Sequence, residues 1–174
     1  DVVVLPEAKR SEGSTAYEIA REYLKDGAET LFVEFPMLKS VEARKEFRKR
    51  NADMILEHLR DGKKVGFLTI GDPMTYSTYV YILEYLDGMI PVETIPGISS
   101  FSDMSSRFNL PLVIGEESLK VVSLNGETDI VGEINSADNI VFMKVSRNFD
   151  KLREGLEITG NLENVIMVSN CGKE

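Results

Sequence analysis

The sequence of 174 residues is 43% hydrophobic and 28% charged, as in ordinary globular proteins, and its length fits one or two domains. The net charge of −9 argues against non-specific binding to nucleic acid, which needs a basic surface, and no apolar run approaches the ~20 residues of a membrane span. One Cys and one His exclude an internal disulfide, disfavour a metal site or a His-based triad, and favour a cytoplasmic location.

The first part of the chain alternates short apolar runs with longer segments of helical periodicity. Thr15 and Glu18 have the spacing of a helix capping box, and Asp26-Gly27 and Asp61-Gly62 supply stop signals after two predicted helices. The predicted strands are 2–5, 31–35, 65–70 and 90–95, and the predicted helices are 15–24, 40–60, 77–86 and 98–108.

Pro111 and the composition around Gly115 interrupt this pattern, and a domain boundary is predicted there. Beyond it the predicted strands are 120–124, 139–145 and 165–169, and the predicted helices are 129–135 and 149–158. Strands that alternate with helices favour an α/β fold with mostly parallel sheets. The expected domains are an N-terminal α/β domain, residues 1–113, and a partial C-terminal α/β domain, residues 114–174.

A tight turn of sequence Gly71-Asp72-Pro73 follows the predicted strand 65–70. Such a turn places backbone N–H groups at the carboxyl end of a strand, where open α/β sheets bind ligands. Because Asp is a common N-cap and Pro a common first helical residue, the triplet is equally compatible with the start of a helix. The hydroxyl-bearing residues that follow favour a site for a zwitterionic small molecule with an amino-acid end and a ribose; they are Thr75, Tyr76, Ser77 and Thr78.

A second turn between a strand and a helix, Pro96-Gly97-Ile98-Ser99-Ser100, comes one βα unit later. In isolation, a Ser N-cap is the simpler interpretation of this turn. Successive parallel strands put their carboxyl ends on the same edge of a sheet, so we expect both turns to line one crevice.

Basic residues are concentrated on the predicted helix 40–60; they are Arg44, Lys45, Arg48, Lys49 and Arg50. This cluster is a candidate site for a polyanion, as are Lys9 and Arg10, although a solvated helix face is the simpler explanation. We expect His58 to cap or pack near the end of the helix and Cys171 to be an ordinary thiol. For Met143, within a predicted strand, core packing is the default.

Together these segments resemble the tetrapyrrole methylase family, S-adenosyl-L-methionine-dependent enzymes of cobalamin and sirohaem synthesis. The resemblance covers nearly the whole chain and rests on Gly71-Asp72-Pro73, on residues 96–100 and on Met143-Lys144-Val145. The extended motif from Gly71 to Thr78 resembles the branch of (cobalt-)precorrin-2 methyltransferases, which methylate carbon 20 of the macrocycle. The resemblance implies two α/β domains with the cofactor in the cleft between them, usually in a homodimer.

The resemblance also implies which residues contact S-adenosyl-L-methionine, or its product S-adenosyl-L-homocysteine: Ile70, Gly71, Asp72, Thr75, Ser99, Ser100 and Met143. For Met143 this replaces the interpretation as a core residue. Tyr76 and Ser77 are candidates to face the tetrapyrrole, and Arg48 and Arg50 are candidates to bind its many carboxylates. No catalytic residue is assigned, because the reduced macrocycle itself supplies an electron-rich carbon and a strong base is not obligatory.

One departure from the family is clear. Its members begin with a Gly-x-Gly-Pro-Gly-Asp loop after their first strand, and this sequence has none. We therefore expect a chain truncated at both ends, which itself binds weakly or is inactive. The alternatives within the family are a uroporphyrinogen-III or precorrin-4 type of methylase and a diphthine synthase, and the alternative from another class is a non-catalytic nucleotide-binding α/β module.

Overall fold

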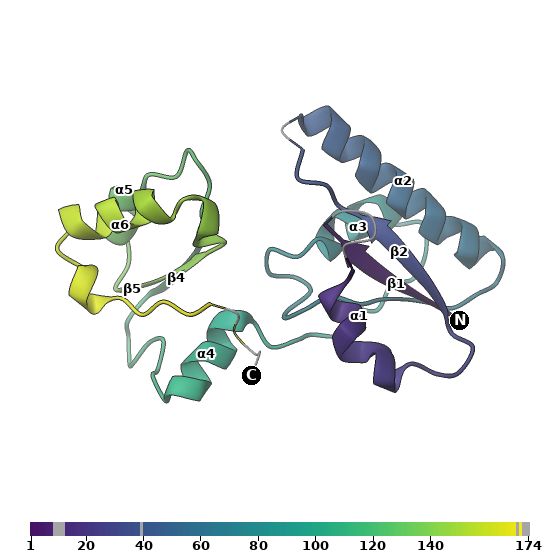
Figure 1. The fold of residues 1–174 in the computed structure, drawn as a ribbon, viewed down its shortest axis with the longest axis horizontal. Coiled ribbons are helices and arrows are strands. Elements are labelled where there is room, and N and C mark those ends of the chain that lie inside the picture. Colours follow the sequence, from purple (N-terminus) through teal and green to yellow (C-terminus); the bar gives the residue numbers. More distant parts are fainter. Residues whose placement is uncertain (9–12, 39, 170, 172–174) are drawn as a thin grey trace. The chain divides into compact units, whose positions relative to one another are not determined.

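The structure is a computed structural model that describes residues 1–8, 13–38, 40–169 and 171. It divides into two compact units, Asp1–Ile98 and Ser99–Glu174 (Figure 1), and each unit is described by itself. This division falls before the boundary that the composition predicted after residue 113, so helix α4 (Ser100–Phe108) belongs to the second unit. The domain limits 1–113 and 114–174 stay a prediction.

The first unit is built on a parallel sheet of three strands in the order β2-β1-β3. The strands are β1 (Val2–Glu7), β2 (Glu29–Glu34) and β3 (Val65–Phe67). The central strand β1 is an almost continuous apolar run because both of its faces are covered, and Val4 and Leu5 are fully buried. All three strands run in the same direction, so the loops that follow them leave from one edge of the sheet.

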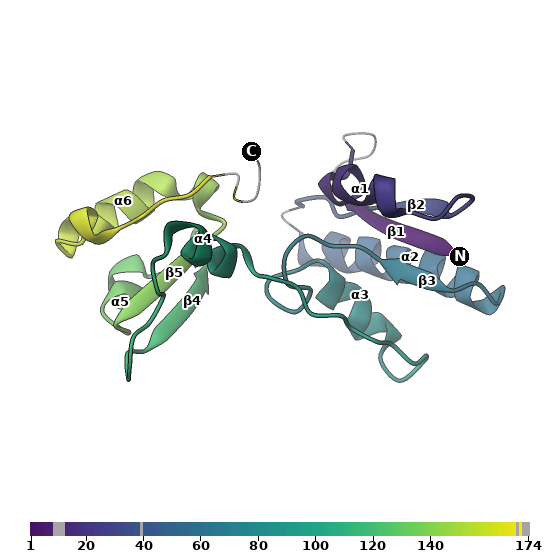
Figure 2. The same ribbon diagram turned by 90° about the horizontal axis from the view of Figure 1, so that it is seen from below.

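Helices cover both faces of this sheet (Figure 2). They are α1 (Thr15–Ala20), which continues as the 3-10 turn η1 (Arg21–Tyr23), α2 (Val41–Arg60) and α3 (Tyr79–Leu86). On the α1 face, the ring of Tyr17 meets Phe32 edge to face, with 5.7 Å between ring centroids.

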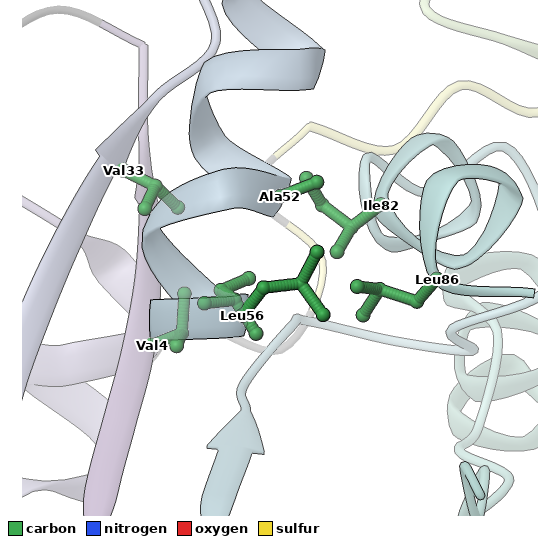
Figure 3. Packing of buried hydrophobic residues seen from close by; sticks show 7 residues of the cluster. Val4, Val33, Ala52, Leu56, Ile82 and Leu86 are labelled. Carbon is green, nitrogen blue, oxygen red and sulfur yellow. The ribbon is translucent and has the colours of Figure 1, made fainter. Parts of the chain in front are cut away.

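The opposite face carries the main core, where α2 and α3 pack on the sheet (Figure 3). Val4 and Val33 from neighbouring strands meet Leu56 of α2, and α2 in turn contacts Ile82 and Leu86 of α3. Side chains alternate between the faces of a strand, so this core uses one set of positions and the α1 face uses the other.

The second unit contains a parallel pair of strands, β4 and β5, with its core formed by Leu124, Ile130, Leu152 and Leu156. Gly155 lets its helix approach the helix of Ile130 closely, because a Cβ atom at position 155 would lie 2.5 Å from the Ile130 side chain. The elements after α4 are β4 (Leu119–Ser123), α5 (Ile130–Ile134), β5 (Asn139–Met143), η2 (Val145–Arg147), α6 (Phe149–Ile158) and η3 (Leu162–Asn164).

The expected α/β class with parallel sheets is confirmed, but two predicted strands are wrong. Residues 90–95 and 165–169 form no strand in the described part of the chain. A strand needs a neighbour that supplies hydrogen-bond partners, and the only described strand beside β3 is β1. An apolar run alone therefore does not decide whether a strand forms.

Element boundaries also differ from the prediction. The helix α1 begins after Ser14, so Thr15 is its first residue and not its cap. Strand β3 ends at Phe67, before the predicted end at residue 70. Strand β5 ends at Met143 because Lys144 adopts a left-handed backbone conformation with φ 60°.

Candidate functional site

The loop between β3 and α3 lies at the carboxyl edge of the first sheet. The N–H of Leu68 still donates to the carbonyl of Val4 at 2.9 Å, and α3 begins only at Tyr79, with Thr78 at the N-cap position. Asp72 and Pro73 therefore do not start a helix. The interpretation of Gly71-Asp72-Pro73 as a helix cap is wrong, and the triplet is part of an irregular loop.

The side chain of Asp72 organises this loop. Its Oδ1 atom accepts hydrogen bonds from the N–H of Met74 at 2.9 Å and from the hydroxyl of Thr75 at 3.0 Å, and Oδ2 accepts from the N–H of Gly97 at 3.3 Å. The bond to Met74, two residues on, is an Asx turn. Partial loss of water acts to raise the pKa of Asp72, but these hydrogen bonds outweigh it and hold the pKa below its ordinary value.

The hydroxyl groups of the loop bond mainly to the loop itself. The hydroxyls of Thr69 and Ser77 share a hydrogen bond of 3.1 Å, and the Ser77 oxygen also accepts from the N–H of Tyr79 at 3.2 Å. Tyr76, which lies between Thr69 and Ser77 in the sequence, has a left-handed backbone with φ 51° and a half-exposed side chain. Thr75 and Ser77 thus help to build the turn, and the expectation that the hydroxyl groups of residues 75–78 face a ligand stays a prediction.

The second turn lies directly against the first. A Cβ atom on Gly97 would be 2.2 Å from the carbonyl oxygen of Gly71, so only glycine permits this approach. The buried Tyr79 helps to hold the preceding segment, because its hydroxyl shares a hydrogen bond of 2.7 Å with that of Thr94. The two turns therefore touch at Gly71, Asp72 and Gly97, although the predicted strand 90–95 that was to place the second turn does not form. That both turns line one ligand crevice stays a prediction.

The remaining predicted cofactor residues lie in the second unit. Ser99 is the N-cap of α4, where its hydroxyl accepts from the N–H of Ser102 at 3.4 Å, and Ser100 is the first helical residue. Met143 ends β5 opposite Ser123, with its carbonyl accepting from the N–H of Leu124. The local role of Ser99 is thus the N-cap that the turn itself suggested, and the cofactor contacts of Ser99, Ser100 and Met143 stay predictions.

The basic residues of α2 take part in contacts within the first unit. The guanidinium of Arg48 lies 3.4 Å from the ring centroid of Tyr81 in α3, and that of Arg50 lies 4.5 Å from the ring of Phe47. Lys49 pairs with Asp53 at 2.7 Å. The structure therefore favours a structural role for part of the cluster, and a role in substrate binding stays a prediction. Lys9 and Arg10 lie outside the described residues.

His58 and Cys171 lie in separate polar clusters. His58 Nε2 lies 3.9 Å from Glu29, which begins β2 at the amino edge of the sheet and also pairs with Lys63 at 2.6 Å. The Cys171 thiol donates to Asp103 at 3.2 Å, and this bond and the ion pair with Arg107 lower the pKa of Asp103. Neither cluster belongs to the loop of Asp72.

The sequence did not identify the parts that three residues play in shaping the loop. Thr69 and Tyr79 were not singled out, and Gly97 was not recognised as the hydrogen-bond partner of Asp72. Only the glycine in the second turn carried a signal, since glycine marks close backbone approach.

None of the described helices combines the length and apolar character needed to cross a membrane. Within the described ranges, no group of three or more His, Cys, Asp or Glu residues is arranged to hold a metal ion.

Comparison with known proteins gives consistent matches. The sequence family described as "Tetrapyrrole (Corrin/Porphyrin) Methylases" matches residues 1–174. A cobalt-precorrin-2 C(20)-methyltransferase of Salmonella typhimurium (strain LT2) is 31% identical over 172 residues, which cover 98% of this chain and 73% of the relative. A probable cobalt-precorrin-2 C(20)-methyltransferase of Methanocaldococcus jannaschii is 33% identical, over 96% of this chain and 69% of the relative.

Solved structures agree on the fold. A cobalt precorrin-4 methyltransferase superposes with a TM-score of 0.67 at 18% identity, covering 91% of this chain and 64% of that chain. The methyltransferase CobJ gives a TM-score of 0.54 at 16% identity, over 90% of this chain and 75% of that chain. At this level of identity the likeness concerns the fold alone.

Proposed function

We propose, since this chain belongs to the tetrapyrrole (corrin/porphyrin) methylase family, that it methylates carbon 20 of (cobalt-)precorrin-2 in cobalamin biosynthesis. Membership confirms the family expected from the sequence and places the chain among the methyltransferases. One observation carries the finer assignment: identity of 31% along nearly the whole chain to the Salmonella enzyme named for this reaction. Since the precorrin-4 enzyme resembles this chain in fold alone, it does not favour a different substrate.

The residues of the first unit fit S-adenosyl-L-methionine, a ligand with both apolar and zwitterionic parts. Exposed Ile70 and Ile98 provide apolar surface next to Gly71, whose backbone has φ 74° and whose missing Cβ would lie 3.5 Å from the carbonyl oxygen of Ile98. The proposed contacts are Ile70, Gly71, Asp72, Thr75, Ser99, Ser100 and Met143. When bound, this cofactor supplies an electrophilic methyl group on its sulfonium.

We extend the proposal to the substrate side with Tyr76, Ser77, Arg48 and Arg50. Tyr76 has the strained backbone that often marks a functional loop, and its side chain is half exposed. An arginine that stacks on a ring uses the face of its guanidinium, so Arg48 retains in-plane N–H donors for a carboxylate. Replacement of both arginines by Ala should weaken substrate binding, and unchanged affinity would contradict their assignment.

The proposal includes the architecture that the resemblance implies. Two α/β domains, residues 1–113 and 114–174, would hold the cofactor in the cleft between them, and the protein would act as a cytoplasmic homodimer. Sedimentation velocity over a range of concentrations tests the dimer directly. A monomer at every concentration would contradict it.

A panel of substrates tests the proposed reaction. Purified full-length protein is incubated with S-adenosyl-L-methionine and, in parallel, uroporphyrinogen III, precorrin-2, cobalt-precorrin-2 and cobalt-precorrin-4, and S-adenosyl-L-homocysteine is measured. The proposal predicts product only with a precorrin-2 form. Turnover of another tetrapyrrole supports a different family member, and binding of ATP without binding of S-adenosyl-L-homocysteine supports the non-catalytic nucleotide-binding module.

A further inference from the structure

One carboxylate connects two turns that are distant in the sequence. Asp72 holds its own turn through Oδ1, which accepts from Met74 and Thr75, and reaches the second turn through Oδ2, which accepts from Gly97. The residues Asp72 and Gly97 are separated by 25 positions. The contact therefore fixes the position of one turn relative to the other.

The backbone contact beside this carboxylate leaves little freedom. A Cβ atom on Gly97 would lie 2.2 Å from the carbonyl oxygen of Gly71, 3.0 Å from its carbonyl carbon and 3.4 Å from the Cα atom of Asp72. The two turns thus touch through their main chains, at a spacing that only a glycine permits. The hydrogen bond from the Gly97 N–H to Asp72 and the close approach of Gly97 to Gly71 thus belong to the same contact between the two turns.

We infer that Asp72 is a positioning residue, which couples the turn at residues 71–75 to the turn at residues 96–98 so that both act as one surface. This inference rests on the proposed function, because the surface is the one assigned to the methyl donor. Oδ1 already accepts two hydrogen bonds and Oδ2 one, so the side chain of Asp72 acts mainly on the protein, and the contact proposed for Asp72 with the methyl donor is made by its backbone. Exposed Ile70 and Ile98 are the side chains whose spacing it sets.

Asparagine at position 72 would disturb this contact while keeping the shape of the side chain. An amide has one oxygen and one NH2 group. If the NH2 group faces Gly97, two donors oppose each other. If the oxygen faces Gly97, the NH2 group opposes the N–H of Met74, while the Thr75 hydroxyl turns to accept from it. Asp72→Asn therefore cannot satisfy all three donors, and Gly97→Ala attacks the same contact from the other side.

Hydrogen exchange at the Gly97 amide tests the coupling without any ligand. In Asp72→Ala, which removes both carboxylate oxygens, we expect exchange at Gly97 to be roughly tenfold faster, as for the loss of one hydrogen bond. The matched control is Gly126→Ala, because a Cβ atom there meets nothing within 4 Å, and it should leave exchange at Gly97 unchanged. Unchanged exchange at Gly97 in Asp72→Ala would overturn the inference whether or not the protein is a methyltransferase.

A double-mutant cycle then separates positioning from direct contact. We measure the Kd of S-adenosyl-L-homocysteine, and KM and kcat for the methyl donor, in Asp72→Asn, in Gly97→Ala and in the double variant. Each single variant should weaken binding roughly ten- to a hundredfold. The double variant should bind no more weakly than the single variant with the larger Kd, because both substitutions break the same contact. Effects that multiply would overturn the inference in favour of direct ligand contact by the carboxylate of Asp72.

Folding and ligand controls keep these outcomes distinct. Urea unfolding identifies a Gly97→Ala protein that does not fold, and the exchange measurement on Asp72→Ala then decides alone. If the unmodified full-length protein binds no S-adenosyl-L-homocysteine, the proposed function fails, while the exchange at Gly97 still decides whether Asp72 couples the turns.

Discussion

The pKa of Asp72 makes the stability of its loop depend on pH. Hydrogen bonds from Met74, Thr75 and Gly97 hold this pKa below its ordinary value of about 3.9. A carboxylate with a lowered folded-state pKa stabilises the protein at pH values above its unfolded-state pKa. That stabilisation disappears as the pH falls through the folded-state pKa.

We therefore expect Asp72→Asn to be less stable than the unmodified protein by a constant amount above about pH 5, with the difference narrowing below about pH 4. Urea unfolding of both proteins from pH 3 to pH 7 measures this difference. A gap that widens on acidification would show that the carboxylate does not stabilise the folded state as an anion.

Packing between elements is concentrated where α2 and α3 meet the first sheet. Ile82 of α3 is 1% exposed and lies in the cluster with Val4 and Leu56. Ile82→Ala should lower the free energy of unfolding by about 2–5 kcal/mol, because the deletion leaves a cavity. Ile19→Ala is the control, since Ile19 is 61% exposed and its truncation should change stability by less than about 0.5 kcal/mol. Equal effects in urea unfolding would contradict this location of the core.

The contact between α2 and α3 also includes Arg48 over the ring of Tyr81, at 3.4 Å. A double-mutant cycle with Arg48→Ala and Tyr81→Ala should give a coupling of about 0.5–1 kcal/mol. Arg50 over Phe47 is the matched pair within one helix. If the cycle shows no coupling, the contact between Arg48 and Tyr81 does not stabilise the protein, and Arg48 has only its proposed role in substrate binding.

The elements show which sequence signals were sufficient. Helices α2, α3 and α6 follow from apolar periodicity and stop signals, and the buried strand β1 from its continuous apolar run. Residues 90–95 have a similar apolar character but form no strand. Periodicity reports which face of a segment is apolar, whereas a strand also depends on a neighbour that is distant in the sequence.

Across the whole molecule, the sequence predicted the class of fold and the family, and it placed the two turns at one sheet edge by means of a strand, 90–95, that does not form. It did not predict that Asp72 bonds to Gly97, or that Tyr76 adopts a left-handed backbone. A motif indicates which residues are close along the chain, but the partner of a carboxylate and the strain of a loop arise from tertiary contacts. The same limit applies to Arg48, whose neighbour Tyr81 belongs to another helix.

The central claim concerns the position that receives the methyl group. The most direct test uses S-adenosyl-L-methionine labelled with carbon-13 in its methyl group, with cobalt-precorrin-2 as the acceptor and carbon NMR of the isolated product as the measurement. For the full-length protein we predict a single labelled methyl group attached to carbon 20. Label at any other carbon of the macrocycle, or no transfer by a protein that binds S-adenosyl-L-homocysteine, would contradict it.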